Sequence, residues 1–178
     1  RDVAPSRGLG DVYKRQILDF NYTASTRLIL KQCGLSDEDI DNRLIKVHGE
    51  ASNNDIIFGV EDNAGIKKEH VFLRKAYNIK YKALNFSELY DRIKSVAIFG
   101  HSLGETDHTY FNKLFQESCM YNKFSTNNNK EFWLFYYKEN GYHCMMQQLD
   151  SLTHNSLTSF RQYNRVNFIN TDKEKVFI

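Results

Sequence analysis

The segment Ser95–Asp107, SVAIFGHSLGETD, is the most informative part of this sequence for predicting the fold. It begins as an uncharged apolar run, passes through Gly100, Ser102 and Gly104, and ends in acidic residues that suit the first turn of a helix. This order is typical of a buried parallel strand that leads through a tight turn into a helix. In open α/β sheets, ligands bind at the carboxyl ends of such strands.

Two further apolar runs also end in polar side chains. Residues 17–23 (ILDFNYT) contain Asn21, and residues 44–50 (LIKVHGE) contain His48. Because the carboxyl ends of parallel strands meet at one edge of a sheet, we expect Asn21, His48 and Ser102 to lie in one pocket.

Short apolar runs alternate with amphipathic segments, which is typical of a parallel sheet flanked by helices. Strands are expected at residues 17–20, 44–47, 55–58, 96–99, 132–137 and 166–169. Helices are expected at residues 24–33, 66–84, 86–93 and 106–118, with two weaker ones before the last strand. The sequence therefore predicts a Rossmann-like α/β fold, a single domain over residues 17–178 that is incomplete at its first strand.

Residues 1–16 are expected to lie outside this fold. They hold the only proline, Pro5, and no apolar period, and the chain begins with Arg1. Residues 6–16 (SRGLGDVYKRQ) resemble a translated sequencing-adapter tail, so we treat them as non-native or disordered. An authentic basic arm is the alternative.

Charge and cysteine content exclude several classes of protein. Residues 1–16 carry four basic and two acidic side chains of the 24 and 22 in the chain, so the remainder carries 20 of each sign. These charges are interspersed, whereas a nucleic-acid-binding protein concentrates basic residues on one face. Three unevenly spaced cysteines support neither a disulfide framework nor a metal site. With no signal peptide and no membrane span, we expect a cytoplasmic protein.

The turn Gly100–Gly104 also satisfies G-x-S-x-G, the nucleophile elbow of α/β-hydrolases. The bulky residues after it, beginning at Glu105, do not suit the close helix–strand packing of an elbow, and no downstream acid or histidine follows a convincing strand. We therefore expect Ser102 to cap the following helix or to contact a ligand phosphate, with a serine hydrolase as the alternative.

His48 and Asn21 are candidate site residues because both lie at the ends of predicted strands. Taken alone, a histidine before a glycine is a hydrogen-bonded strand terminus, and a lone asparagine is a turn residue. The remaining candidates lack such a context and are expected at the surface or in an interface: His101, His108, His143 and His154.

The four strand-end blocks together resemble the bacteriophage abortive-infection family AbiH. The blocks are residues 17–23, 46–50, 56–59 and 98–107, in this order, and the resemblance extends from Ile17 to about Tyr137. The family's amino-terminal block, a strand that ends in a Gly-Asn-Gly-Phe-Asp turn, has no counterpart, as expected of a truncated reading frame.

AbiH proteins are in turn similar, distantly, to sirtuin-like NAD-consuming domains. This resemblance implies a site in which Asn21 and His48 are catalytic. It implies that the dinucleotide is bound by Gly49, Gly100, Ser102, Leu103 and Asp107. Thr23 stands where the sirtuin loop carries an aspartate, and there are no zinc-ribbon cysteines, so protein deacylation is not expected and neither is a metal.

The resemblance implies an abortive-infection antiphage protein with NAD hydrolysis as its candidate activity and NAD as candidate substrate. Cleavage of the nicotinamide bond needs a group that holds the ribose or a water, as Asn21 could, and a base, as His48 could. A non-catalytic sensor of a nucleotide or phage component is the alternative. Expected partners are a dinucleotide or other small molecule and an unknown phage trigger, not nucleic acid or membrane, and a homo-oligomer is left open. Without the amino-terminal glycine turn, we expect the 178-residue chain to bind dinucleotide poorly.

Overall fold

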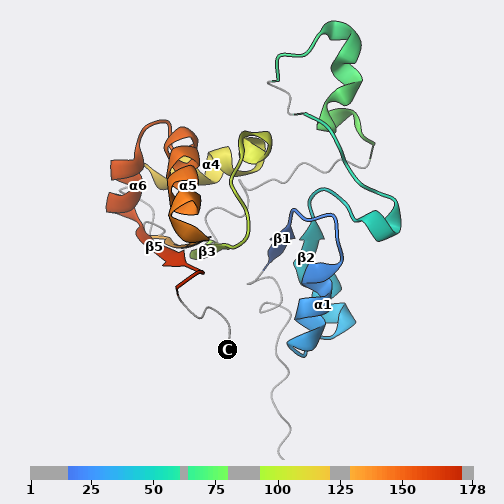
Figure 1. Ribbon diagram of the computed structural model, residues 1–178, viewed down its shortest axis with the longest axis horizontal. Helices are drawn as coiled ribbons and strands as arrows, with labels where there is room; N and C mark the ends of the chain where they lie inside the picture. The colour runs from blue at the N-terminus through green and yellow to red at the C-terminus, as the bar shows by residue number, and fades with distance from the viewer. Residues whose placement is uncertain (1–15, 61–63, 80–92, 121–128, 174–178) are drawn as a thin grey trace, which may run out of the picture. The chain divides into compact units, whose positions relative to one another are not determined.

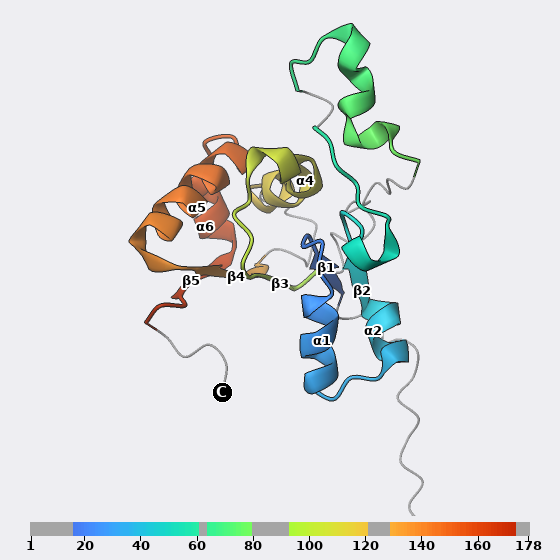
Figure 2. The same ribbon diagram turned by 45° about the vertical axis from the view of Figure 1, so that its right-hand side comes forward.

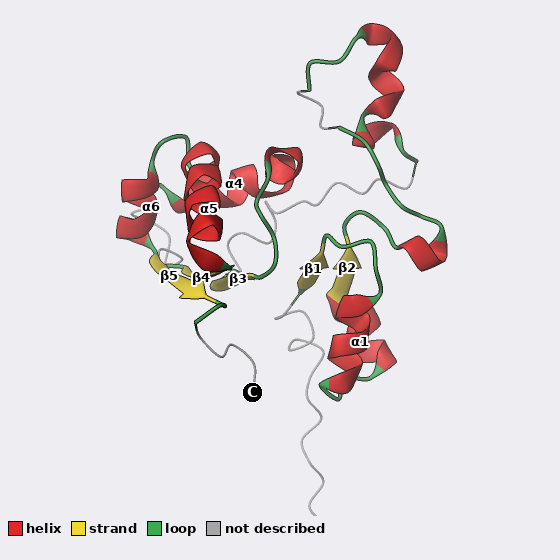
Figure 3. Ribbon diagram, in the orientation of Figure 1, coloured by secondary structure: helices red, strands yellow, loops and turns green. Residues whose placement is uncertain are grey.

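The computed structural model describes residues 16–60, 64–79, 93–120 and 129–173. The chain divides into two compact units, Arg1–Lys82 and Ala83–Ile178. Each unit contains one small parallel sheet with helices beside it, as the colouring of Figure 3 shows. The mixed α/β class and the parallel pairing agree with the sequence prediction, and the strands form a two-stranded and a three-stranded sheet.

The first unit is built on two parallel strands. β1 (Ile17–Asp19) pairs with β2 (Leu44–Lys46), and the register sets Asp19 opposite Lys46. The two strands are connected through α1 (Ser25–Gln32) and α2 (Asp37–Arg43), which lie side by side (Figure 2). Both strands begin where the apolar runs predicted them, and both end just before the polar residues of interest.

Helix α2 has no counterpart among the predicted elements. Its sequence contains one buried apolar residue, Ile40, so it shows no amphipathic period. It is stabilised instead at its N-terminus, where the Ser36 hydroxyl accepts a hydrogen bond from the Asp39 amide at 3.1 Å. Acidic residues in the first turn complement the helix dipole.

The segment after β2 differs from the prediction in two places. Residues 55–58 are not a strand; instead Val60 forms an isolated parallel bridge with Arg74. Within the described part of the segment predicted as a helix over residues 66–84, only the short 3-10 helices Lys68–Leu73 and Lys75–Tyr77 are present. Phe72 and Tyr77 are both 63% exposed, so no packed face stabilises a longer α-helix there.

The second unit contains a parallel sheet in the order β3-β4-β5. Its strands are β3 (Ser95–Ile98), β4 (Glu131–Tyr136) and β5 (Arg165–Asn170). Its helices are the 3-10 turn Glu105–Asp107, α4 (His108–Ser118), α5 (Lys138–Leu152) and α6 (Leu157–Tyr163). The three strands were predicted with boundaries shifted by one residue, and the helix predicted over residues 106–118 is α4 preceded by the 3-10 turn. Helices α5 and α6 correspond to the two weaker helices, which were predicted without boundaries. The predicted helix over residues 86–93 lies mostly outside the described residues.

The core of the second unit lies between the sheet and its helices. Helices α4, α5 and α6 cover one face of the sheet in both views (Figures 1 and 2). Phe132 stacks on Phe115 of α4 and packs edge-on against Phe160 of α6, with ring centroids 5.6 and 4.8 Å apart. The predicted apolar stripe of α4 is buried, as is the inward face of β4. Phe111 of this stripe also contacts His101 in the turn after β3, with ring centroids 5.3 Å apart.

Candidate functional site

The first candidate residues lie at the carboxyl end of the β1–β2 sheet. Val47 continues the pairing beyond β2, because its amide donates to the Asp19 carbonyl at 2.9 Å. Continuing the register therefore brings Asn21, two residues beyond β1, toward the level of His48, two residues beyond β2. Asn21 is exposed and His48 is 4% exposed.

Two aromatic residues on either side of Asn21 contact the His48 ring. Tyr22 stacks on it with centroids 5.9 Å apart, and Phe20 meets it edge-on at 5.4 Å. The two residues that bracket Asn21 in the sequence therefore both lie against the imidazole. Asn21 and His48 consequently share one end of one sheet within the first unit.

A buried ion pair lies beneath this end of the sheet. The Lys46 ammonium is 2.8 Å from Asp19 Oδ2, and the Asp19 side chain is 2% exposed. Burial by itself would raise the pKa of Asp19, but hydrogen bonds from Lys46, the Asn21 amide and Thr26 together hold it below its usual range. Asp19 is therefore a fixed negative charge at neutral pH.

Gly49 fills a structural role in the tight turn after His48. Its φ is +73°, and a Cβ at this position would lie 2.7 Å from the Asp55 carbonyl carbon and 2.9 Å from Asp55 Oδ1. The Asp55 carboxylate also accepts the Glu50 amide at 2.6 Å. The Asp55 main chain therefore occupies the space beside Gly49. The resemblance implied that a dinucleotide binds there.

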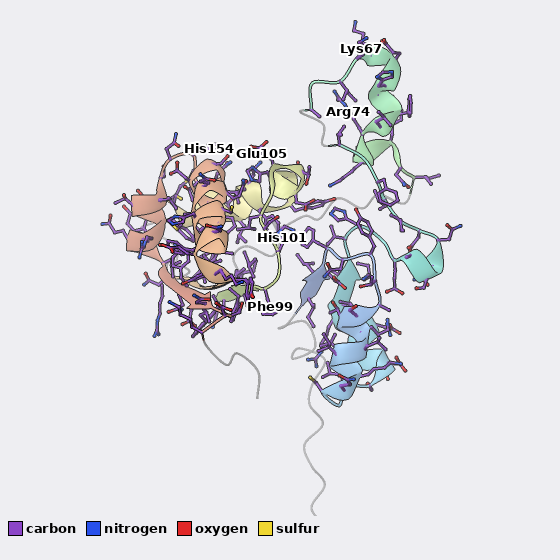
Figure 4. The ribbon with its side chains drawn as sticks, viewed as in Figure 1. Lys67, Arg74, Phe99, His101, Glu105 and His154 are labelled. Carbon is purple, nitrogen blue, oxygen red and sulfur yellow. The ribbon has the colours of Figure 1, made fainter. Side chains whose placement is uncertain are left out.

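The second group of candidates forms the turn between β3 and α4. Gly100 has φ +65° with open space where a Cβ would lie, and Leu103 has φ +54° with a fully buried side chain. Figure 4 shows Phe99, His101 and Glu105 in succession along this connection. The turn thus leaves β3 through two left-handed residues and exposes backbone at Gly100.

His101 and His108 hold this turn from opposite sides. Nδ1 of His101 accepts the Leu103 amide at 2.9 Å, and its Nε2 lies 3.3 Å from Asp107 Oδ2. Nε2 of His108 lies 3.0 Å from the Leu103 carbonyl and 2.9 Å from the Gln148 side chain. These histidines were expected at the surface or in an interface, and each one is part-buried and hydrogen-bonded to the main chain of Leu103.

Ser102 is exposed, and two roles besides catalysis were expected of it, a helix cap and a phosphate contact. Capping is wrong, because no side chain caps the 3-10 turn Glu105–Asp107 or helix α4. Its neighbour His101 is engaged through both ring nitrogens, by Leu103 and Asp107, so this histidine does not serve as a base for Ser102. A phosphate contact at Ser102 stays a prediction.

The predicted site residues thus fall into two groups, one in each unit. Asn21, His48 and Gly49 belong to the first unit. The second unit carries Gly100, Ser102, Leu103 and Asp107. His101 and Lys46 were not predicted as site residues from the sequence. The position of Lys46 opposite Asp19 in the register could have identified Lys46.

The described residues contain neither a cluster of metal-ligating side chains nor a membrane-spanning helix. Across residues 16–60, 64–79, 93–120 and 129–173, no group of three or more His, Cys, Asp or Glu side chains is arranged to hold a metal ion. None of the helices in these ranges combines the length and the apolar character needed to cross a membrane.

Comparison with known proteins places the chain in a family. A family profile described as bacteriophage abortive infection AbiH matches residues 5–137. The matched region ends at Tyr137, where the sequence resemblance also ends, and it begins at Pro5, within the stretch expected to lie outside the fold. No curated protein and no solved structure matches the chain. Because the match covers residues 5–137 of a 178-residue chain, the protein belongs to the bacteriophage abortive infection AbiH family.

Proposed function

We propose that this protein acts in abortive infection by hydrolysing the bond between nicotinamide and ribose in NAD. Membership of the AbiH family supports the defence role. The observation that supports the enzymatic role is the position of Asn21 between Phe20 and Tyr22, both of which contact the His48 ring. A polar side chain and a histidine at one strand end are what water addition to a ribosyl cation requires.

In the proposed reaction, the bond between the ribose C1′ and the nicotinamide nitrogen breaks and nicotinamide leaves as a neutral molecule. Positive charge develops on the ribose, and a water oxygen forms the new bond to C1′. Asn21 holds the water or a ribose hydroxyl in place. His48 accepts the proton that the water loses, so the products are nicotinamide, ADP-ribose and one proton.

Burial of His48 sets a condition on this reaction. The ring is 4% exposed and Tyr22 stacks on one of its faces. In the proposal, the Tyr22 ring moves aside as the substrate enters. Tyr22 also touches the exposed Phe58, at a centroid distance of 5.3 Å, so the ring that has to move lies at the surface of the unit.

We propose separately that the turn Gly100–Leu103 of the second unit binds a phosphate or a ribose. Open space at the Gly100 Cβ position and the exposed Ser102 leave main-chain and hydroxyl groups accessible to a phosphate or a ribose. Leu103, buried and bonded on both of its main-chain sides, keeps this turn in one conformation.

The test is release of nicotinamide from NAD by the purified protein, expressed from its natural coding sequence. We expect release by the wild type, and loss of at least 100-fold with His48→Ala and with Asn21→Ala. The matched control is His143→Ala, which removes an exposed histidine that pairs with Glu139. Phage protection that survives His48→Ala would favour a sensor, and labelling of Ser102 by a fluorophosphonate would favour a serine hydrolase.

A further inference from the structure

The Lys46 ammonium is surrounded by the connection between β1 and α1. Besides the contact with Asp19 Oδ2 at 2.8 Å, it donates to the carbonyls of Asn21 and Thr23, each at 2.6 Å. A lysine ammonium has three hydrogens, so these three acceptors use its full donor capacity. Glu50 Oε2 is a further neighbour at 3.8 Å. The side chain is 17% exposed, so its charge interacts with groups of the protein and little with solvent.

These contacts hold the main chain of Asn21 on both sides. Its amide donates to Asp19 Oδ1 at 2.9 Å, and its carbonyl accepts from Lys46. The next carbonyl, that of Tyr22, accepts the Ala51 amide at 2.8 Å. The connection is therefore tied to the segment that carries His48 at three successive residues, Asn21, Tyr22 and Thr23, while the Asn21 residue itself is exposed.

We infer that Lys46 is a positioning residue that fixes Asn21 relative to His48; its effect on catalysis rests on the proposed function. Asp19 and Lys46 are opposite each other in the register, so the sheet fixes the position of the Lys46 ammonium. The ammonium in turn holds the connection that follows β1. A lysine suits this task because its three hydrogens diverge, whereas the guanidinium of arginine is a planar fork that matches a carboxylate but not three separate acceptors.

The inference predicts a specific kinetic effect. Misplacement of a catalytic group by about 1 Å costs on the order of 100-fold in rate. We therefore expect Lys46→Met to lower kcat about 100-fold with little change in KM, and Lys46→Arg, which keeps the charge beside Asp19, to recover part of the loss. Because Lys46 acts through Asn21, adding Lys46→Met to Asn21→Ala should change the rate less than about threefold.

The experiment combines nicotinamide release with hydrogen exchange of the Asn21 and Ala51 amides in the full-length protein. Lys46→Met leaves the Asp19 carboxylate buried without its cation, which can prevent folding. The paired variant Asp19→Asn/Lys46→Met removes both charges and serves as the second test. Lys113→Met is the control, since this half-exposed lysine lies at 3.5 Å from Glu117 on α4, in the other unit.

We expect both amides to exchange at least tenfold faster in Lys46→Met and in the paired variant than in Lys113→Met. Unchanged exchange rates of the two amides would overturn the inference. It would also be overturned if the rate losses of Lys46→Met and Asn21→Ala multiply in the double variant. In either case, a wild type that releases nicotinamide leaves the proposed function standing. A wild type that releases no nicotinamide would overturn the proposed function, and with it the catalytic effect of Lys46, whatever the exchange data show.

Discussion

Gly49 illustrates how one residue fixes the geometry next to His48. The main chain of Asp55 approaches so closely that a side chain at position 49 has no room, and the backbone there is left-handed. The Ile57 amide donates to the His48 carbonyl at 2.9 Å, so this return of the chain also ties His48 itself. A glycine at position 49 is therefore a condition for the turn that follows His48.

We predict that Gly49→Ala lowers the free energy of unfolding by about 3 kcal/mol, from left-handed strain and overpacking together. Gly34→Ala is the matched control: its φ is +85°, but no atom lies within 4 Å of the Cβ position. It should cost about 1 kcal/mol, the strain alone. Urea denaturation of both variants measures the difference, and equal losses would show that Asp55 does not crowd Gly49.

The Asp19 carboxylate gives the protein a pH-dependent contribution to stability. Its pKa is lowered in the folded state, so its contribution is complete above the unfolded value near 3.8 and is lost as pH falls toward the folded value. We predict that wild type is more stable than Asp19→Asn at pH 7 and that the gap narrows as pH falls from about 5 to about 2. Urea titrations across this range measure it. A gap that stays constant or widens would contradict the assignment.

At the scale of elements, the β3–α4 turn combines two opposing demands on Leu103. Its side chain is completely buried, which favours a large apolar residue, but its backbone is left-handed, which favours glycine. The hydrogen bonds from the Leu103 amide to His101 and between its carbonyl and His108 compensate part of this strain. The conformation of the proposed dinucleotide turn thus depends on two histidines beside it.

We predict that Leu103→Gly is more stable than Leu103→Ala by about 1 kcal/mol, although both lose the buried side chain. The control is Leu114, 2% exposed in α4, where glycine should be less stable than alanine by about 1 kcal/mol. Thermal unfolding of the four variants decides it. The same order at both positions would show that Leu103 is not left-handed in solution.

The elements that sequence reasoning predicted well are those with strong apolar patterns. Helix α4 and strand β4 bury Phe115 and Phe132 against each other, so their periodicity reflects their packing. Helix α2 was missed because a capping serine and acidic residues stabilise it, with only Ile40 buried. The helix predicted over residues 66–84 followed apolar spacing that the structure does not use, since Phe72 stays exposed.

For the molecule as a whole, the sequence predicted only those candidate site residues that follow the ends of strands. Asn21 and His48 could be named as candidates because each follows a predicted parallel strand, and ligands bind at the carboxyl ends of such strands. Lys46 depends on register, and His101 depends on a turn conformation, and neither can be read from composition or spacing. Family membership adds the biological role, which no strand-end pattern contains.

The most direct measurement of the central claim is the NAD and nicotinamide content of phage-infected bacteria that carry the natural gene. We predict that NAD falls after infection while nicotinamide rises by the same amount, in wild type and in His143→Gln. We also predict that His48→Gln abolishes both the fall in NAD and the protection against phage. Protection with an undiminished NAD pool, or NAD loss that persists in His48→Gln, would contradict it.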